Sequence, residues 1–205
     1  NNTIGGSSAA ARNVISGNND DGISVTGTGT SANLIQGNYI GTDASGTAAL
    51  GNSGEGILIY SDASGITVGG DAVGEGNVIS ANGSDGIQIG STSSIASDIT
   101  IQGNLIGTDK TGVLDLANTQ SGIDLENGQN VLIGGTAANA GNTIAFNDQL
   151  GIELDSAATD ISILANSIYA NADIGIDWGV DGVTPNDTGE QNYPVLSSAF
   201  TNGVN

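Results

Sequence analysis

The stretch SGNNDDGISV, Ser16 to Val25, decides the fold, because its pattern returns five more times along the chain. In every copy an asparagine stands four positions before a glycine that opens the motif Gly-Ile-x-apolar. The six asparagines are Asn18, Asn52, Asn82, Asn118, Asn147 and Asn171. A motif that recurs in this way predicts a repeat architecture, in which each copy stacks on the next.

Two further short apolar runs accompany each copy of the motif. Both are rich in β-branched residues and are bounded by Gly, Asn, Asp and Ser, which is typical of strands rather than helices. The first set is centred on Ile4, Ile35, Val68, Ile101, Ile133 and Ile163, and the second on Ile15, Ile40, Ile79, Ile106, Ile144 and Ile168. Each unit therefore has three strands, the third being the Gly-Ile motif itself.

The spacing of these runs indicates how the units are connected. The distance from the first run to the second alternates between 11 and 5 residues, and the "IGG" signals near Ile4, Val68 and Ile133 lie 64 and 65 residues apart. We therefore predict an all-β, right-handed parallel β-helix (a solenoid) of about six coils, each with three short strands. Two-coil repeats of ~65 residues fill residues 1–180, and residues 181–205 form an acidic C-terminal loop and closing segment.

Stacking gives the motif asparagines a structural role. Equivalent residues of successive coils lie above one another, so the six asparagines form a ladder at the corner before the third strand, where each amide both donates and accepts. Asparagine tolerates left-handed turns, and the glycine that follows frees the backbone. Two inward columns follow from the motif, one led by Ile23 and one running from Val25 to Trp178. We expect Trp178 to close the core rather than to serve as a platform for a sugar ring.

Composition excludes several classes of function. The net charge is −20, with 2 basic and 22 acidic residues, so nucleic acids and anionic membranes are excluded as partners. The chain has no Cys, Met or His, which excludes disulfides, thiolate or imidazole metal sites, and histidine chemistry. No run is long and apolar enough to insert into a membrane. The sequence opens in mid-repeat at NNTIGG, so we expect a piece of a longer protein.

Several segments resemble a known repeat. They are NTIGG, ARNVISGN, NLIQGNYIGTDASGTAALGN, NVISANGSDGIQI and ITIQGNLIGTDKTG, followed by the tail GIDWGVDGVTPNDTGEQNYPVLSSA. They resemble the tandem parallel β-helix repeat modules of large secreted or cell-surface bacterial proteins. The resemblance covers nearly the whole chain, although the last coil lacks the GTD insertion. It implies a parallel β-helix fold and an extracellular or cell-surface location in a bacterium.

An acidic stripe is the main candidate for chemistry. The outward positions of the third strands end in Asp124, Glu153 and Asp177, about 5 Å apart from coil to coil, a separation that suits glycoside hydrolysis. Asp20 and Asp21 also resemble the paired aspartates of polygalacturonase-like enzymes. An enzyme of that kind, or a polysaccharide lyase, needs further basic groups, whereas Arg12 and Lys110 are single residues in different loops. We expect the stripe to stay exposed and ionised, and we assign no catalytic residue.

Calcium binding is an alternative use of the acidic residues. Asp21, Glu55 and Asp85 make a second acidic column, and the tail brings together Asp177, Asp181, Asp187 and Glu190. Calcium prefers oxygen ligands, but neither an EF-hand nor a nonapeptide calcium motif occurs, so we expect a solvated acidic surface and assign no cofactor or metal ligand.

A repeated loop is a further candidate. It places Thr42 over Thr108 and Asp43 over Asp109, which predicts an Asx turn in each copy and a corner open to a ligand or partner.

These observations favour a non-enzymatic structural or adhesive (adhesin-like) module of a long secreted or surface-anchored protein. Its partners are flanking domains of the parent protein, with glycans or surface partners as further candidates. The alternative is a carbohydrate-binding or carbohydrate-cleaving β-helix that uses the acidic stripe.

Overall fold

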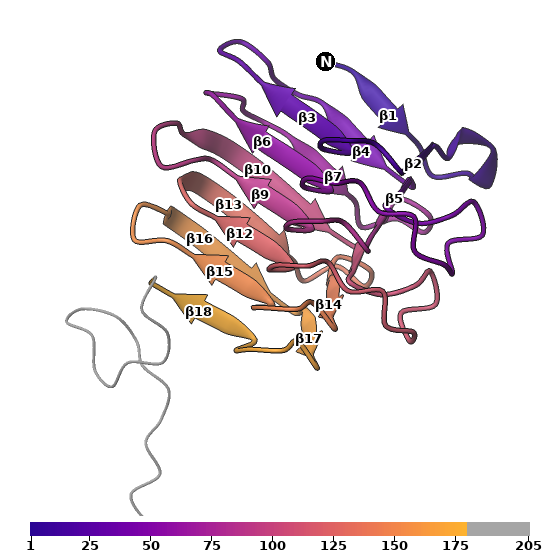
Figure 1. Ribbon diagram of the computed structural model, residues 1–205. Coiled ribbons are helices and arrows are strands. Elements are labelled where there is room, and N and C mark those ends of the chain that lie inside the picture. Colours follow the sequence, from indigo (N-terminus) through magenta and orange to yellow (C-terminus); the bar gives the residue numbers. More distant parts are fainter. Residues whose placement is uncertain (180–205) are drawn as a thin grey trace, which may run out of the picture.

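The chain folds into a right-handed parallel β-helix of six coils (Figure 1). The structure is a computed structural model and describes residues 1–179. Each coil contributes one strand to each of three six-stranded parallel sheets. A single turn of 3-10 helix, η1 (Ala9–Ala11), lies in the first coil. The predicted fold class, number of coils and number of strands per coil are confirmed.

The strands of each sheet follow one another in chain order. Sheet A consists of β1 (Thr3–Gly5), β4 (Leu34–Gln36), β7 (Thr67–Gly69), β10 (Ala96–Gln102), β13 (Gly128–Gly134) and β16 (Thr159–Leu164). Sheet B consists of β2 (Val14–Ile15), β5 (Tyr39–Ile40), β8 (Val78–Ile79), β11 (Leu105–Ile106), β14 (Thr143–Ala145) and β17 (Ser167–Tyr169). Sheet C consists of β3 (Ile23–Thr26), β6 (Ile57–Tyr60), β9 (Ile87–Ile89), β12 (Ile123–Leu125), β15 (Ile152–Leu154) and β18 (Ile176–Trp178).

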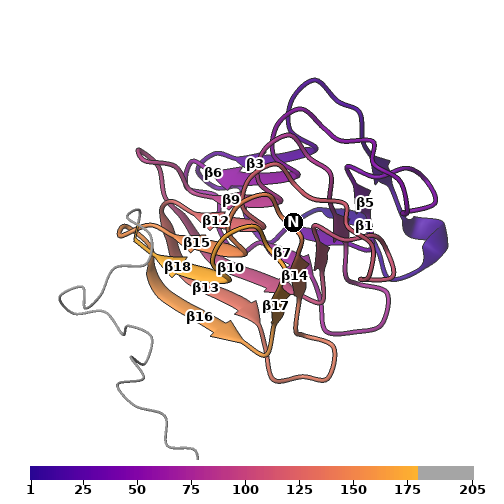
Figure 2. The ribbon, with the colours of Figure 1, turned by 60° about the horizontal axis from the view of Figure 1, so that its bottom comes forward.

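The register matches the predicted strand centres. In sheet A, Ile4 pairs with Ile35 and Ile35 with Val68, and in sheet C Ile123 pairs with both Ile87 and Ile152. Figure 2 shows the three sheets wrapping around a common interior. The inward isoleucines of the four middle coils are fully buried there. Because equivalent residues stack at about 4.8 Å, this interior is a set of continuous aliphatic columns.

The predicted asparagine ladder is present at the corner between sheets B and C. Each side-chain amide nitrogen donates to the side-chain oxygen of the asparagine in the next coil, at 2.7–2.9 Å, from Asn18 through to Asn171. Asn118 is fully buried, and its amide also donates to the carbonyl of Ile79 at 3.1 Å. Across residues 1–179 no buried polar side-chain atom lacks a hydrogen-bond partner. The ladder thus satisfies amides that would otherwise be costly to bury.

A second ladder, which the sequence analysis missed, lies at the corner between sheets A and B. Its members stand directly before each strand of sheet B and are linked in the same way at 2.9–3.0 Å. They are Asn13, Asn38, Asn77, Asn104, Asn142 and Asn166. The signal was present in the sequence as an asparagine two positions before the central isoleucine of every run in the second set.

The backbone explanation of the motif needs correction. None of the ladder asparagines has a positive φ; in the tight corners it is the residue before the asparagine that does, such as Ala81 (62°) and Ala165 (55°). The motif glycine is required for space rather than for an unusual φ. At Gly122 a Cβ atom would lie 2.7 Å from the carbonyl oxygen of Gly151 and 2.8 Å from the amide nitrogen of Asn147. The absence of a side chain there lets the ladder pass close to the backbone.

Trp178 is more exposed than predicted. It pairs with Leu154 and so keeps the register of the inward column. Half of its surface is nevertheless exposed (50%), because β18 is the last strand of sheet C in the described residues and no further described coil stacks on it. The predicted segment 181–205 lies outside the described residues.

Replacement of Asn118 by Ala should lower the free energy of unfolding by about 1–3 kcal/mol, because it removes a fully buried member of the ladder and leaves its partners unsatisfied. Asn19→Ala is the matched control, since Asn19 is exposed in the same corner of the first coil. Chemical denaturation with urea measures both variants. Equal midpoints for Asn118→Ala and the wild type would contradict the structural role of the ladder.

Candidate functional site

The carboxylates that face outward from sheet C form the candidate site. Their strands place Gln88, Asp124 and Glu153 side by side, and Glu153 pairs in turn with Asp177. The predicted stripe is therefore one continuous column, because a parallel register aligns equivalent residues of successive coils. All three of its acidic members are half-buried rather than exposed.

A second acidic column runs beside the stripe. Its residues stand directly before the glycine that opens the Gly-Ile motif. The backbone pairs the residues of this column, since Gly22 and Gly56, which follow Asp21 and Glu55, donate to the carbonyls of Glu55 and Asp85 at 2.9 Å. The backbone nitrogen of Glu55 also donates to the Asp21 carboxylate at 3.2 Å. The predicted alignment of Asp21, Glu55 and Asp85 is confirmed.

Ser121 connects the two columns, and the sequence analysis did not identify it. It occupies the position of Asp85 one coil further on, and its backbone nitrogen donates to the Asp85 carboxylate at 2.7 Å. Its hydroxyl donates to the Glu153 carboxylate at 2.9 Å. Asp85, Ser121 and Glu153 thus form a chain of hydrogen bonds across three coils, with Asp85 almost fully buried (4% exposed).

The close spacing of acids changes their protonation. Burial, and after it the negative charges of Asp85 and Glu153, together raise the pKa of Asp124 to about 8. Burial likewise raises the pKa of Asp85 to about 7, with the charges of Glu55 and Glu153 adding to the effect. The prediction that the whole stripe stays ionised is therefore wrong for Asp124, because stacking desolvates its carboxyl among like charges.

The aspartates of the repeated loops tie down their own loops, as predicted. The Asp43 carboxylate accepts hydrogen bonds from the backbone of Thr47 and Ala48 and from the Ser45 hydroxyl, and these bonds, that of Ser45 first, lower its pKa to about 2. In the equivalent loop, burial opposes ionisation of Asp109. The hydrogen bonds from Leu114, Thr111 and Val113 outweigh that effect and lower its pKa. Both aspartates therefore organise their own loops.

The two loops also touch each other. The backbone nitrogen of Lys110 donates to the carbonyl of Gly46 at 2.9 Å, although two coils separate their positions in the repeat. Thr42 and Thr108 are fully buried beneath the loops. The two repeated loops therefore pack on each other, and this packing gives them a structural role in the stack.

The basic side chains do not join the acidic columns. The Arg12 guanidinium lies 4.1 Å from the centre of the Tyr39 ring and donates to the Gly37 carbonyl at 3.0 Å. Lys110 belongs to a loop between sheets B and C. Arg12 and Lys110 thus lie in different loops, as the sequence analysis predicted.

A metal site does not emerge from the acidic columns. Within residues 1–179, no three carboxylates are grouped so that they could hold a metal ion. Of the predicted tail cluster, Asp181, Asp187 and Glu190 lie outside the described residues, and calcium binding stays an open prediction. The described chain has no helix that is long and apolar enough to span a membrane.

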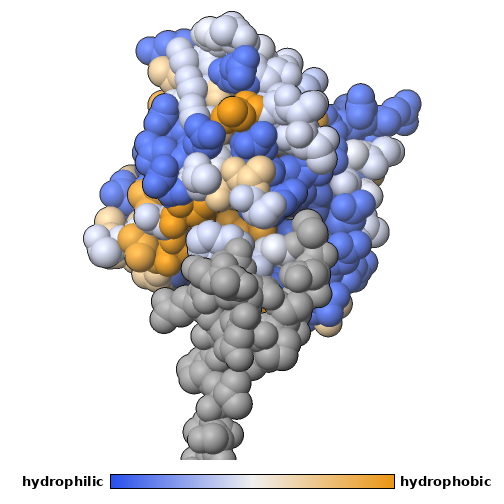
Figure 3. Space-filling model, turned by 90° about the vertical axis from the view of Figure 1, so that its left-hand side faces the viewer, coloured by the Kyte–Doolittle hydropathy of each residue, from blue (hydrophilic) through white to orange (hydrophobic). Residues whose placement is uncertain are grey.

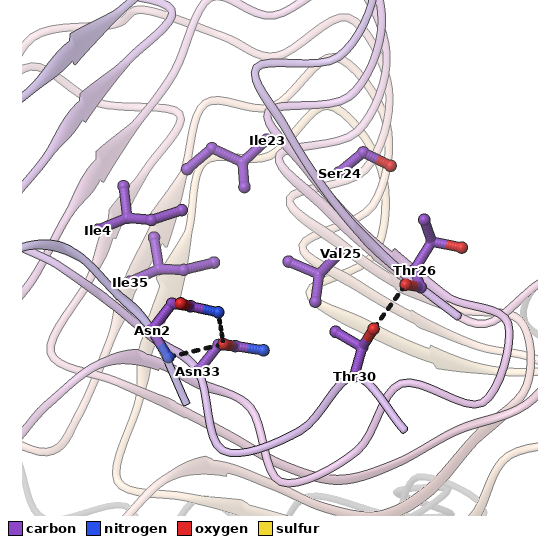
Figure 4. A pocket seen from close by; sticks show the side chains of 9 residues that line it. All are labelled: Asn2, Ile4, Ile23, Ser24, Val25, Thr26, Thr30, Asn33 and Ile35. Atoms are coloured by element: carbon purple, nitrogen blue, oxygen red, sulfur yellow. Dashed lines mark hydrogen bonds between the residues drawn. The ribbon is translucent and has the colours of Figure 1, made fainter. Parts of the chain in front are cut away.

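The surface around the corners between sheets C and A is mainly hydrophilic, with one gathering of hydrophobic residues (Figure 3). One cavity lies elsewhere, at the N-terminal end of the described stack, where Ile4, Ile23, Val25 and Ile35 point into it (Figure 4). The acidic columns are thus not the wall of this cavity.

Comparison of the chain with models of known families, with curated proteins and with solved structures found no match. The parallel β-helix class is established by the fold, and membership of a particular repeat family stays an expectation.

The protonated carboxyls should make the fold more stable in mild acid. An acid with a higher pKa in the folded state binds its proton more tightly when folded. The free energy of unfolding therefore falls as the pH rises from about 4, where unfolded Asp titrates, to about 8, where Asp124 does. Thermal melts between these limits measure the slope. Asp124→Asn should reduce the slope, of which Asp85 with its pKa of about 7 keeps a part, whereas Asp71→Asn, at an exposed position, should leave it unchanged.

Salt should also stabilise the fold, because a net charge of −20 repels itself and dissolved ions screen that repulsion. We expect the Tm to rise with NaCl, and to rise equally with CaCl2 at matched ionic strength. A distinctly larger rise with calcium would reveal a specific calcium site and contradict the view of a solvated acidic surface.

Proposed function

We propose that the chain is a non-enzymatic structural module of a long secreted or cell-surface bacterial protein. The observation that supports this best is the continuity of the interior. Two asparagine ladders and the isoleucine columns run through the described coils without a break, and their members in the middle coils are almost fully buried. A stack in which the strands of each coil pair with those of the coils before and after it is a stiff, one-dimensional element, suited to holding flanking domains apart.

The charge supports the same proposal. A surface with 22 acidic and 2 basic residues stays soluble and repels other acidic surfaces, which suits a spacer exposed to the medium. The resemblance of segments such as NLIQGNYIGTDASG to tandem repeats of large bacterial surface proteins points in the same direction. Flanking domains of the parent protein are the proposed partners, and an adhesive role toward glycans is the natural extension.

A second candidate is a carbohydrate-cleaving β-helix, and one observation favours it. Asp124 has a pKa raised to about 8 and stands beside Glu153 on the adjacent strand. A protonated acid next to a second carboxylate is the arrangement that glycoside hydrolases use. The basic residues argue against this candidate, because Arg12 is bound to Tyr39 and Gly37, away from the acidic columns.

Incubation of the protein with polygalacturonate, alginate, xylan or carrageenan should release no reducing ends, since the described carboxylates lack groups that would grip a sugar ring. A reducing-sugar assay measures this, and a glycan array with titration calorimetry measures binding without cleavage. Products that disappear in Glu153→Gln but persist in Asp71→Asn would overturn the structural proposal in favour of the enzyme. Binding without cleavage would support the adhesive role.

A further inference from the structure

Two asparagines of the described chain stand directly before a glycine, and they lie in opposite environments. Asn82 belongs to the ladder at the corner between sheets B and C, whereas Asn127 lies at the corner between sheets C and A, outside both ladders. An asparagine followed by glycine is the pair most open to spontaneous deamidation, because glycine has no side chain to keep its backbone nitrogen away from the asparagine side chain. The fold therefore places the same reactive pair in two different surroundings.

Deamidation places three demands on its surroundings. The backbone nitrogen of the glycine loses its proton and attacks the side-chain carbonyl carbon of the asparagine, so that a new C–N bond forms. The bond from that carbon to the side-chain nitrogen then breaks, ammonia leaves with the proton, and a cyclic succinimide remains. Water adds to one of the two succinimide carbonyls and opens the ring to aspartate or isoaspartate. The asparagine side chain must therefore rotate freely, the glycine N–H must be available, and water must have access.

The ladder prevents all three at Asn82. The amide nitrogen of Asn82 donates to the side-chain oxygen of Asn118 at 2.9 Å, and its side-chain oxygen accepts from the amide of Asn52 at 2.9 Å. The N–H of Gly83, which would have to attack, donates to the carbonyl of Asn52 at 2.8 Å. Asn82 itself is almost fully buried. The reaction at Asn82 must therefore wait until the ladder opens locally.

The side chain of Asn127 has no such restraint. No residue of the described chain forms a hydrogen bond with it, and Asn127 is only half-buried. Its backbone is held loosely as well, since its N–H donates to the carbonyl of Ile89 at 3.3 Å and its carbonyl accepts from the N–H of Ala96 at 3.2 Å. Both distances exceed the usual value of about 2.9 Å for such bonds. The side-chain amide of Asn127 can therefore rotate toward the nitrogen of Gly128.

We propose that Asn127 is a site of spontaneous deamidation and that the asparagine ladder protects Asn82 from the same reaction. The product adds a carboxylate directly after Glu126, whose negative charge already opposes ionisation of Asp85 and Asp124. Isoaspartate also lengthens the backbone by one carbon atom just before β13 begins at Gly128. Modification at Asn127 thus changes the charge and the backbone of one corner, whereas the same change at Asn82 would break a buried ladder.

Peptide mapping by mass spectrometry tests the proposal on the folded protein, incubated in mildly alkaline buffer for a series of times. Digestion with pepsin at low pH stops the reaction during mapping, and separate peptides distinguish Asn127 from Asn82. They also distinguish both from Asn202, which precedes a glycine outside the described residues. In the folded protein Asn127 should convert at least about tenfold faster than Asn82, because only Asn82 requires local opening. In guanidinium chloride the two should convert at comparable rates, because the ladder is then absent.

Asn118→Ala removes the ladder partner of Asn82, so it should speed conversion at Asn82 more than at Asn127. Asn19→Ala, at an exposed position, is the matched control and should change neither rate. Circular dichroism verifies that each variant is folded. If Asn118→Ala does not fold, the comparison of folded and unfolded wild type decides alone. Equal rates at Asn127 and Asn82 in the folded protein overturn the proposal. So does an Asn127 that stays intact while the unfolded chain converts, or a folded Asn118→Ala variant in which Asn82 is as stable as in the wild type.

Discussion

The hydrogen bond between stacked asparagine amides is the interaction on which the rest of the structure depends. It repeats at the spacing of one coil, and each amide needs the next at the same height to be satisfied. A shift of one residue in any strand would leave a buried amide without its partner, at a cost comparable to a lost buried hydrogen bond. The ladders therefore fix the register, and the register in turn aligns the isoleucine columns and the acidic columns.

Register is also what made the fold readable from the sequence. The strand centres, such as Ile101 and Ile106, are predictable because short β-branched runs between Gly, Asn and Asp have few other conformations open to them. The first ladder is predictable because its asparagines accompany a glycine in every coil. The second was missed because asparagine before an apolar pair, as in Asn104 before Leu105, is unremarkable in a single copy and informative only when all six are aligned.

The candidate site was harder to predict, for a physical reason. Sequence spacing places Asp124 and Glu153 in one column, but it does not tell how much of each carboxyl the neighbouring coils cover. That burial is what raises the pKa of Asp124. Ser121 bridges the two acidic columns from a position that carries an acid in the preceding coils but not in its own. The role of the motif glycine was misjudged similarly, since the crowding at Gly122 comes from Asn147 and Gly151 in the next coil.

A structure stabilised by stacking is strongest in its middle and weakest at its ends. Ile57, Ile87 and Ile123 have neighbours above and below and are fully buried, whereas Ile23 at one end and Ile176 at the other retain exposed surface, 7% and 45%. The same holds for the ladders, whose inner members are buried and whose outer members have open groups. Parallel sheets have no means of satisfying their outermost strands from within. The inner coils are therefore held from both sides, whereas the first and last described coils are held by described residues from one side only.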